Sequence, residues 1–280
     1  MKTIIYATDC TRHATPALRY AYYLSEALKA NFIVLSVFNL PPIAVSTIRP
    51  PKQLKKMAAE EQMMVLHNYC SRYLKDRMGP HITLDVIASP SISEGILKRT
   101  RALKADLLIL GMKDEHTLRG YFSGNIANAI LEESPCPVLM VPNPYRYRKP
   151  KTMVYATDFE ERDIKAIKQL VLLAAPYGAE IRVVHIPTQE EYAGMEQMEW
   201  FKEMLDQEVD YPNIRFHMIF ADNIQEGLSM YTQEVKADVL AMLERENSRT
   251  VFGKLFHRDR VKAMESRSNI PLLSFNERSF

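Results

Sequence analysis

Short apolar runs alternate along the chain with segments whose apolar residues recur at helical spacing. In the first half the runs predict five strands, at Thr3–Ala7, Phe32–Phe38, Ile82–Ile87, Leu107–Leu110 and Val138–Val141. The segments between them predict helices at Ala14–Leu28, Lys52–Lys75, Ser91–Leu103 and Gly124–Glu133. Apolar strands that alternate with helices are typical of a parallel sheet covered on both faces. The pattern therefore predicts a doubly wound α/β domain, in which ligands bind at the carboxyl ends of the strands.

The second half of the chain repeats this alternation. Its predicted strands are Met153–Ala156, Ile181–Ile186, Ile214–Ile219, Val239–Met242 and Leu272–Phe275. Its predicted helices are Asp163–Ala175, Glu190–Val209, Ile224–Val235 and Asp259–Ser266. Short motifs return in the same order: Tyr6–Asp9 (YATD) matches Tyr155–Asp158, and Ala105–Leu108 (ADLL) matches Ala237–Leu240 (ADVL). We therefore predict two copies of one domain, at 1–143 and 150–280.

The composition is that of an ordinary globular protein. Of 280 residues, 47% are hydrophobic and 25% are charged, and the formal net charge of +2 does not favour nucleic acid or an anionic membrane as a partner. No apolar run approaches the ~18 residues of a membrane span, and the strand predicted at Thr3 leaves no room for a signal peptide. Three cysteines without metal-ligand spacing, Cys10, Cys70 and Cys136, favour reduced thiols and a cytoplasmic location.

One basic segment lies between the two copies. Tyr145–Lys149 reads YRYRK and is flanked by Pro142, Pro144 and Pro150. We interpret this segment as a solvated linker, and the alternative is a docking patch.

The end of the first strand carries the first candidate ligand-binding residues. Asp9 follows Ala7 and Thr8 directly before a predicted helix, where a carboxylate can accept hydrogen bonds from ribose hydroxyls. The alternative is that Asp9 only caps the helix through its backbone N–H groups. Asp158 at the matching position of the second copy supports a partly structural role, so the sequence leaves both interpretations open.

Glycines bound the loop after the fourth strand. Gly111 ends that strand and Gly124 opens the next helix, so the backbone can approach a phosphate closely and direct N–H groups at it. The Asn125 amide can donate to a phosphate oxygen, and Ser123 can cap the helix or act as a second donor. The loop is therefore a candidate anion-binding site.

These segments resemble the universal stress protein family. The resemblance rests on Tyr6–Asp9, Ala105–Gly111 (ADLLILG), Gly124–Leu131 (GNIANAIL) and Ser134–Pro142 (SPCPVLMVP). It extends over both copies and implies two Rossmann-like, adenine nucleotide alpha hydrolase-like domains with five parallel strands each. It also implies an internal pseudo-dimer that pairs the last strands, whose apolar edges invite pairing. The implied nucleotide-binding residues are Ala7, Thr8, Asp9, Val37, Phe38, Leu110, Gly111, Asp114, Ser123, Gly124, Asn125 and Ile126.

The loop departs from the family's nucleotide-binding pattern, G-x2-G-x9-G-(S/T). At these four positions the chain has Gly111, Asp114, Gly124 and Asn125, with the spacing intact. Two negative charges ~4 Å apart repel each other by about 4 kcal/mol at an effective dielectric constant of ~20. Asp114 therefore disfavours a phosphate unless basic neighbours or Mg²⁺ offset its charge. These changes favour adenosine or AMP over ATP as the ligand.

The second copy has lost the pattern altogether. The four positions hold Leu243, Glu246, Phe256 and His257, and the Phe256 ring would obstruct a phosphate. We therefore predict that this copy is a structural or partner-binding scaffold. Trp200, in a methionine-rich helix of the same copy, is predicted to pack against the domain.

The sequence indicates a cytoplasmic stress-response protein that binds an adenine nucleotide, ATP or AMP, with or without Mg²⁺, in its first copy. It contains no catalytic motif or metal-ligand spacing that we recognise, and an enzymatic activity is not favoured. Two other functions stay open. Asp114 and Asn125 favour a nucleotide-free interaction protein with an unknown protein partner, and the same loop is compatible with a slow ATPase. Two such chains can also pair as a homodimer.

Overall fold

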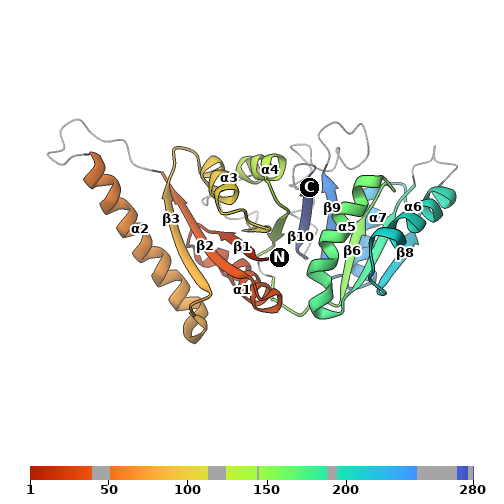
Figure 1. The fold of residues 1–280 in the computed structure, drawn as a ribbon, viewed down its shortest axis with the longest axis horizontal. Coiled ribbons are helices and arrows are strands. Elements are labelled where there is room, and N and C mark those ends of the chain that lie inside the picture. The colour runs from red at the N-terminus through yellow and green to blue at the C-terminus, as the bar shows by residue number, and fades with distance from the viewer. Residues whose placement is uncertain (40–50, 113–123, 144, 188–193, 245–269, 277–279) are drawn as a thin grey trace. The chain divides into compact units, whose positions relative to one another are not determined.

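The computed structural model describes residues 1–39, 51–112, 124–143, 145–187, 194–244, 270–276 and 280. The chain divides into two compact units, Met1–Tyr147 and Arg148–Phe280. Each unit has an α/β architecture with parallel strands (Figure 1). The predicted fold class, with five parallel strands in each half, is confirmed. The predicted pairing of the last strands of the two copies stays a prediction.

The first unit has a five-stranded sheet in the order β3-β2-β1-β4-β5. The helices α1 and α2 contact each other on one face of this sheet, and α3 and α4 contact each other on the opposite face (Figure 1). The strands are β1 (Thr3–Ala7), β2 (Asn31–Phe38), β3 (Ile82–Ala88), β4 (Leu107–Gly111) and β5 (Val138–Val141). The helices are α1 (Thr15–Leu28), α2 (Pro51–Leu74), α3 (Ile92–Ala102) and α4 (Gly124–Glu133), with single 3₁₀ turns at η1 (Arg12–Ala14) and η2 (Lys75–Arg77).

The second unit repeats this topology in the order β10-β9-β6-β7-β8. Its strands are β6 (Thr152–Ala156), β7 (Glu180–His185), β8 (Ile214–Met218), β9 (Val239–Glu244) and β10 (Leu272–Asn276). Its helices are α5 (Glu161–Ala174), α6 (Gly194–Glu208) and α7 (Ile224–Glu234), with a 3₁₀ turn at η3 (Ala175–Tyr177). The helix predicted at Asp259–Ser266 lies outside the described residues. In the described part of the chain, no helix combines the length and the apolar character that a membrane crossing requires.

The repeated Ala-Asp motif fastens the first strand of each unit to the fourth. The Asp106 carboxylate accepts hydrogen bonds from the N–H groups of Lys2 and Thr3, at 2.7 and 2.9 Å. Asp238 accepts from the N–H groups at the start of β6 in the same way, at 2.7 and 3.1 Å. These bonds give the repeat a structural reason, because each carboxylate fixes the register of two neighbouring strands.

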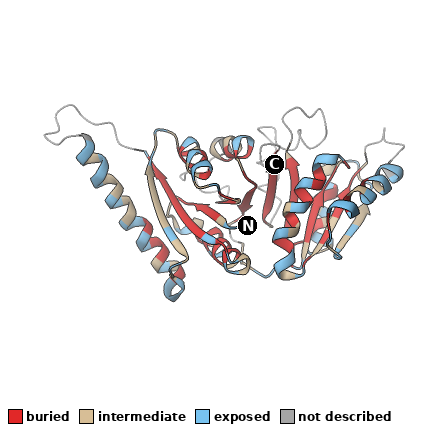
Figure 2. Ribbon diagram, in the orientation of Figure 1, coloured by how far each residue is buried: buried red, intermediate tan, exposed pale blue. Residues whose placement is uncertain are grey.

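The central strands of each sheet are buried on both faces, as Figure 2 shows. In β1, Ile4, Ile5 and Tyr6 are fully buried, which explains why the strands read as uninterrupted apolar runs. Ala7 pairs with Leu35 of β2 on one side and with Leu110 of β4 on the other. The carboxyl ends of β1, β2 and β4 therefore meet at one edge of the sheet.

The segment between the copies is only partly a linker. The Tyr147 ring stacks on Tyr23 of α1 at a centroid distance of 4.6 Å and meets Tyr20 edge-on at 5.3 Å. Tyr145 also contacts Tyr20, at 5.9 Å. The interpretation of a solvated linker is therefore wrong for these two tyrosines. Aromatic rings at helical spacing on α1 provide a surface on which the extended segment packs.

Candidate functional site

The carboxyl edge of the first sheet brings together the predicted residues that come from strands. Ala7 lies opposite Leu110, and Gly111 follows as the last residue of β4. Val37 and Phe38 end β2, and both are buried. The Thr8 N–H donates to the Leu35 carbonyl at 2.9 Å, so the chain leaves β1 beside the end of β2.

The loop residues of the predicted site are described only in part. Asp114 and Ser123 lie outside the described residues, as do Glu246, Phe256 and His257 of the second copy. The helix α4 begins at Gly124, as predicted, with Asn125 and Ile126 in its first turn. The role of these residues toward a phosphate stays a prediction.

Among the described residues, donors reach one of the two carboxylate oxygens of Asp9. Oδ1 accepts hydrogen bonds from the N–H and the hydroxyl of Thr11, at 3.0 and 2.8 Å. These bonds hold the turn before η1, while α1 has no side-chain cap. The alternative that Asp9 caps the helix is therefore not what the geometry shows. Among the described residues no donor reaches Oδ2, so this oxygen is available to a hydroxyl group of a ligand.

Thr8 has a structural role at the end of β1. Its buried hydroxyl oxygen accepts from the Cys10 N–H at 3.0 Å and from the Tyr6 hydroxyl at 3.2 Å. Cys10 has φ 59°, a left-handed conformation that is costly for a residue with a Cβ. The bond from Cys10 to Thr8 helps to hold this conformation, which turns the chain from the strand toward α1.

Small polar side chains lie next to Asp9 at this edge. The Cys10 Sγ is 4.0 Å from the Ser36 hydroxyl, which also accepts a hydrogen bond from the Gln62 amide at 2.9 Å. Burial raises the pKa of the Cys10 thiol to about 11, so the thiol is protonated at neutral pH. A protonated thiol is a poor nucleophile. Cys10 is therefore a small side chain that borders the candidate site beside Asp9.

Aromatic rings fill the equivalent edge of the second unit. Phe159 occupies the position of Cys10 with nearly the same φ, 58°, and His185 occupies the position of Ser36. The Phe159 ring lies 4.6 Å from the His185 ring and 5.5 Å from the Phe201 ring, and all three residues are buried. The sequence patterns did not reveal this cluster, although the offset that pairs Tyr6 with Tyr155 also pairs Cys10 with Phe159.

A buried carboxylate of α5, Asp163, lies at the same edge of the second unit. Asp163 stands where the first unit has Ala14, and it is only 1% exposed. It accepts hydrogen bonds from the hydroxyls of Tyr155 and Thr157, at 2.7 and 2.8 Å, and from the Glu160 N–H at 3.2 Å. The strand end of the second unit is therefore occupied by its own side chains.

Two further sequence predictions concern metals and Trp200. Within the described residues, no three His, Cys, Asp or Glu side chains are grouped so that they could hold a metal ion. A Mg²⁺ ion held by Asp114 stays a prediction. The prediction that Trp200 packs against its domain is wrong, because Trp200 is 53% exposed on α6 and Met195 is 61% exposed.

The sheet order and the crossover helices define a doubly wound α/β protein with its candidate site at the carboxyl ends of β1, β2 and β4. More particularly, the model of the universal stress protein family matches residues 1–142, and the chain belongs to that family. The predicted family is confirmed. The match lies in the first unit, and the tandem arrangement of two such domains stays a prediction.

Solved structures support the same fold over the whole chain. A universal stress protein from Archaeoglobus fulgidus DSM 4304 has a TM-score of 0.63 at 14% identity, with 98% of this chain and 96% of that chain covered. A functionally unknown protein from Pseudomonas aeruginosa PAO1 has a TM-score of 0.61 at 14% identity, with 99% and 92% covered.

The same fold also occurs in a different setting. The cytoplasmic domain of a prokaryotic cation chloride cotransporter has a TM-score of 0.52 at 8% identity, with 98% of this chain and 94% of that chain covered. No curated protein matches the sequence. Because one fold serves unrelated functions, function has to be argued from the site.

Proposed function

We propose that the first unit binds an adenine mononucleotide at the carboxyl edge of its sheet and that the second unit does not. The single observation that carries the proposal is the difference between the two edges. In the first unit, Cys10 and Ser36 are small, and one Asp9 oxygen has no donor among the described residues. In the second unit, Phe159 and His185 take the two small positions.

The chemistry of the first edge suits the sugar of a nucleotide. The two hydroxyls of a ribose can donate to the Asp9 Oδ2, as acidic residues accept from ribose in other doubly wound folds. Gly111 and the first turn of α4 follow along the same loop, and helix N–H groups favour an anion. The adenine specificity follows from the family resemblance.

On this proposal the chain is a cytoplasmic stress-response protein that acts by binding a nucleotide and not by catalysis. The three cysteines, Cys10, Cys70 and Cys136, are free thiols, which accords with a reducing compartment. We favour AMP over ATP because the Asp114 carboxylate repels phosphate groups and AMP carries fewer of them. If Mg²⁺ offsets the charge of Asp114, it should strengthen ATP binding more than AMP binding.

Replacing Asp9 tests the proposal directly. Asp9→Asn should weaken AMP binding by roughly tenfold or more, since a hydrogen bond to a charged group contributes about 1.5–3 kcal/mol. The matched control is Asp158→Asn at the same position of the second unit, which should leave binding unchanged. Calorimetry with AMP, ATP, and ATP with Mg²⁺ measures the affinities. An unaltered affinity of Asp9→Asn, or no heat with any nucleotide, contradicts the proposal.

A second candidate function is that of a nucleotide-free interaction protein. The exposed Trp200 and Met195 on α6 favour it, because large apolar side chains on one surface helix are typical of a protein contact. The same titration separates the candidates. Absence of heat with every nucleotide supports the interaction protein, whereas release of phosphate from bound ATP supports the slow ATPase.

A further inference from the structure

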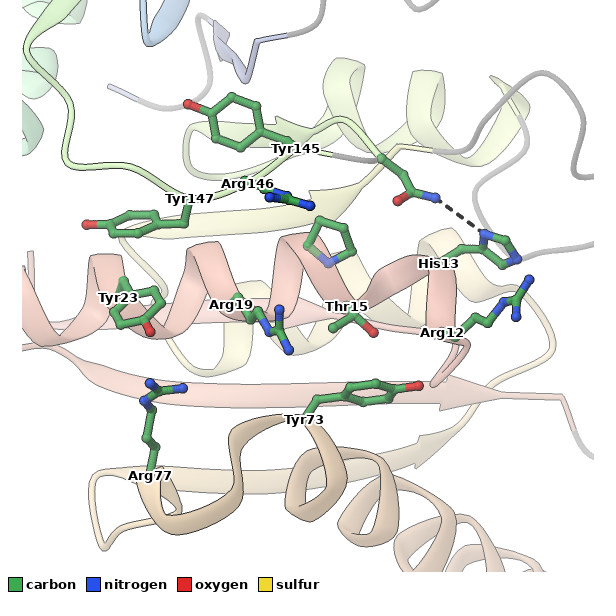
Figure 3. A pocket seen from close by; sticks show the side chains of 12 residues that line it. Arg12, His13, Thr15, Arg19, Tyr23, Tyr73, Arg77, Tyr145, Arg146 and Tyr147 are labelled. Atoms are coloured by element: carbon green, nitrogen blue, oxygen red, sulfur yellow. Dashed lines mark hydrogen bonds between the residues drawn. The ribbon is translucent and has the colours of Figure 1, made fainter.

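Four arginines border one groove on the outer surface of α1. Arg12 and Arg19 come from η1 and α1, Arg77 from η2, and Arg146 from the segment that follows β5. Figure 3 shows α1 between this segment on one side and Tyr73 and Arg77 on the other. The groove encloses about 990 Å³. Three segments that are distant in the sequence thus place their positive charges around one hollow.

The described part of the chain brings no carboxylate to the charges in this groove. Among the described residues, no Asp or Glu lines the groove, and no carboxylate forms an ion pair with any of the four guanidinium groups. The contact described for Arg77 is with the Tyr23 ring, 5.4 Å from its centroid. Elsewhere, arginines such as Arg99 and Arg148 do form ion pairs with aspartates. The groove is therefore a concentration of unneutralised positive charge in a chain whose net charge is only +2.

The walls of the groove are fixed before any ligand arrives. Tyr147 stacks on Tyr23, and this packing holds the neighbouring Arg146 beside α1. At the other end, the Asn143 amide lies 3.3 Å from the His13 ring nitrogen (Figure 3). Since the Tyr23 and Tyr147 rings stack on each other, these two residues offer the groove their hydroxyl groups more than their ring faces.

We propose that this groove binds a small ligand that carries several phosphate groups in a short chain. Guanidinium groups match phosphate oxygens in pairs of hydrogen bonds, which makes phosphate the favoured anion. The backbone positions of Arg12 and Arg19 lie roughly 11 Å apart along the helix axis, so a chain of phosphate groups can contact both arginines more readily than a single phosphate. The volume suits a small molecule. The stacking of Tyr23 on Tyr147 leaves fewer ring faces for single-stranded RNA, whose bases are bound by stacking.

Inorganic tripolyphosphate is the probe that tests this proposal. Calorimetry at low salt should show that the wild-type chain binds it and that Arg19→Gln with Arg77→Gln weakens binding by tenfold or more. The control double variant, Arg72→Gln with Arg215→Gln, removes the same charge outside the groove and should bind within twofold of wild type. Thermal melting of both variants checks that each is folded. No binding by the wild type, or equal losses in both variants, would overturn the proposal.

Two further arms identify the source of the phosphates and separate this groove from the nucleotide site. The Asp9→Asn variant removes the contribution of the nucleotide site. If this variant binds tripolyphosphate and ATP with equal affinity, the groove recognises the phosphate chain and not the molecule that carries it. If Asp9→Asn loses tripolyphosphate binding, the groove is not a site separate from the nucleotide site, and the proposal is overturned. Binding of a ten-nucleotide RNA in place of tripolyphosphate, lost in the groove variant, would overturn the ligand class.

Discussion

Residues in disfavoured backbone conformations recur at the same positions of both copies. Cys10 and Phe159 have φ 59° and 58°, and Lys104 and Lys236 have φ 48° and 52°. Such conformations cost roughly 1 kcal/mol or more for a residue with a Cβ, so they persist only where neighbouring bonds hold them. The Thr8 hydroxyl and its counterpart on Thr157 accept from the N–H groups of Cys10 and Phe159. At this scale the copies share their turns but not the side chains that the turns present.

The three cysteine thiols predict how stability changes with pH. Burial raises the pKa of Cys10 to about 11, and that of Cys70 and Cys136 to about 12, from an ordinary value of 9.0. The unfolded chain therefore loses these protons first as the pH rises. The stability that the neutral thiols contribute is complete below pH ~8 and falls from about pH 9 toward 12, by up to about 1.4 kcal/mol per pH unit and thiol. Urea unfolding in reductant between pH 7 and 10.5 measures this loss.

Removal of one thiol supplies the control for this pH dependence. Cys10→Ser should unfold with a shallower dependence on pH above 9, because a serine hydroxyl does not titrate there. The same slope in the variant and the wild type would show that Cys10 does not contribute to the loss.

At the scale of elements, two glycines let a helix approach a strand end. A Cβ at Gly95 of α3 would lie 2.6 Å from the Val37 Cγ1 and 2.8 Å from the Ser89 Cβ. A Cβ at Gly227 of α7, the matching position, would lie 2.8 Å from the Ala221 Cβ. These contacts are shorter than van der Waals packing allows, so both units require glycine at this helix position. The approach places α3 directly against Val37, one of the predicted nucleotide-binding residues.

Alanine should destabilise the chain at Gly95 but have little effect at Gly111. Gly95→Ala should lower the free energy of unfolding by about 1–2 kcal/mol, because the overpacking exceeds the gain in helix propensity. Gly111→Ala should change it by less than about 0.5 kcal/mol, since the new Cβ would lie at an ordinary 3.4 Å from the Ala17 Cβ. Urea unfolding measures both. A stable Gly95→Ala would show that α3 moves away at little cost.

At the scale of the whole molecule, the two units have the same strand order but different side chains at the carboxyl ends of their strands. Both units keep the Asp that joins the first and fourth strands, and both keep a side-chain cap before the following helix, Ser91 for α3 and Asn223 for α7. Only the first unit has small side chains beside its strand-end aspartate. The second unit fills that place with the ring of Phe159 and with the Asp163 hydrogen bonds. The two units therefore share a strand order and differ in the side chains at their strand ends.

Exchange of one residue between the copies tests whether this difference decides binding. Cys10→Phe should abolish measurable AMP binding, because a phenyl ring would occupy the space beside Asp9. It should also leave the fold intact, since Phe159 shows that phenylalanine is accommodated at this φ. Calorimetry and thermal melting measure the two effects. The reciprocal Phe159→Cys should cost about 2–4 kcal/mol of stability. A Cys10→Phe protein that binds AMP as the wild type does would refute the steric argument.

The sequence predicted the described elements closely because their residues signal burial locally. The strand β1 begins and ends where the apolar run does, and α4 begins at Gly124 as the helical spacing predicted. The same local signals failed for Trp200 and Tyr147. An aromatic residue on a helix or in a linker is buried or exposed according to which distant segment covers it, and hydrophobicity does not specify that segment.

By itself the sequence determined the alternation of strands and helices and predicted two similar halves with Asp9 and Gly111 as candidate residues, because periodicity and repeated motifs are properties of neighbouring residues. The tertiary structure decided which side chains share a strand end: Cys10 with Ser36 in one unit, and Phe159 with His185 and Phe201 in the other. It also gathered four arginines around one groove. Contacts between segments tens of residues apart depend on how the chain packs, and no local pattern encodes them.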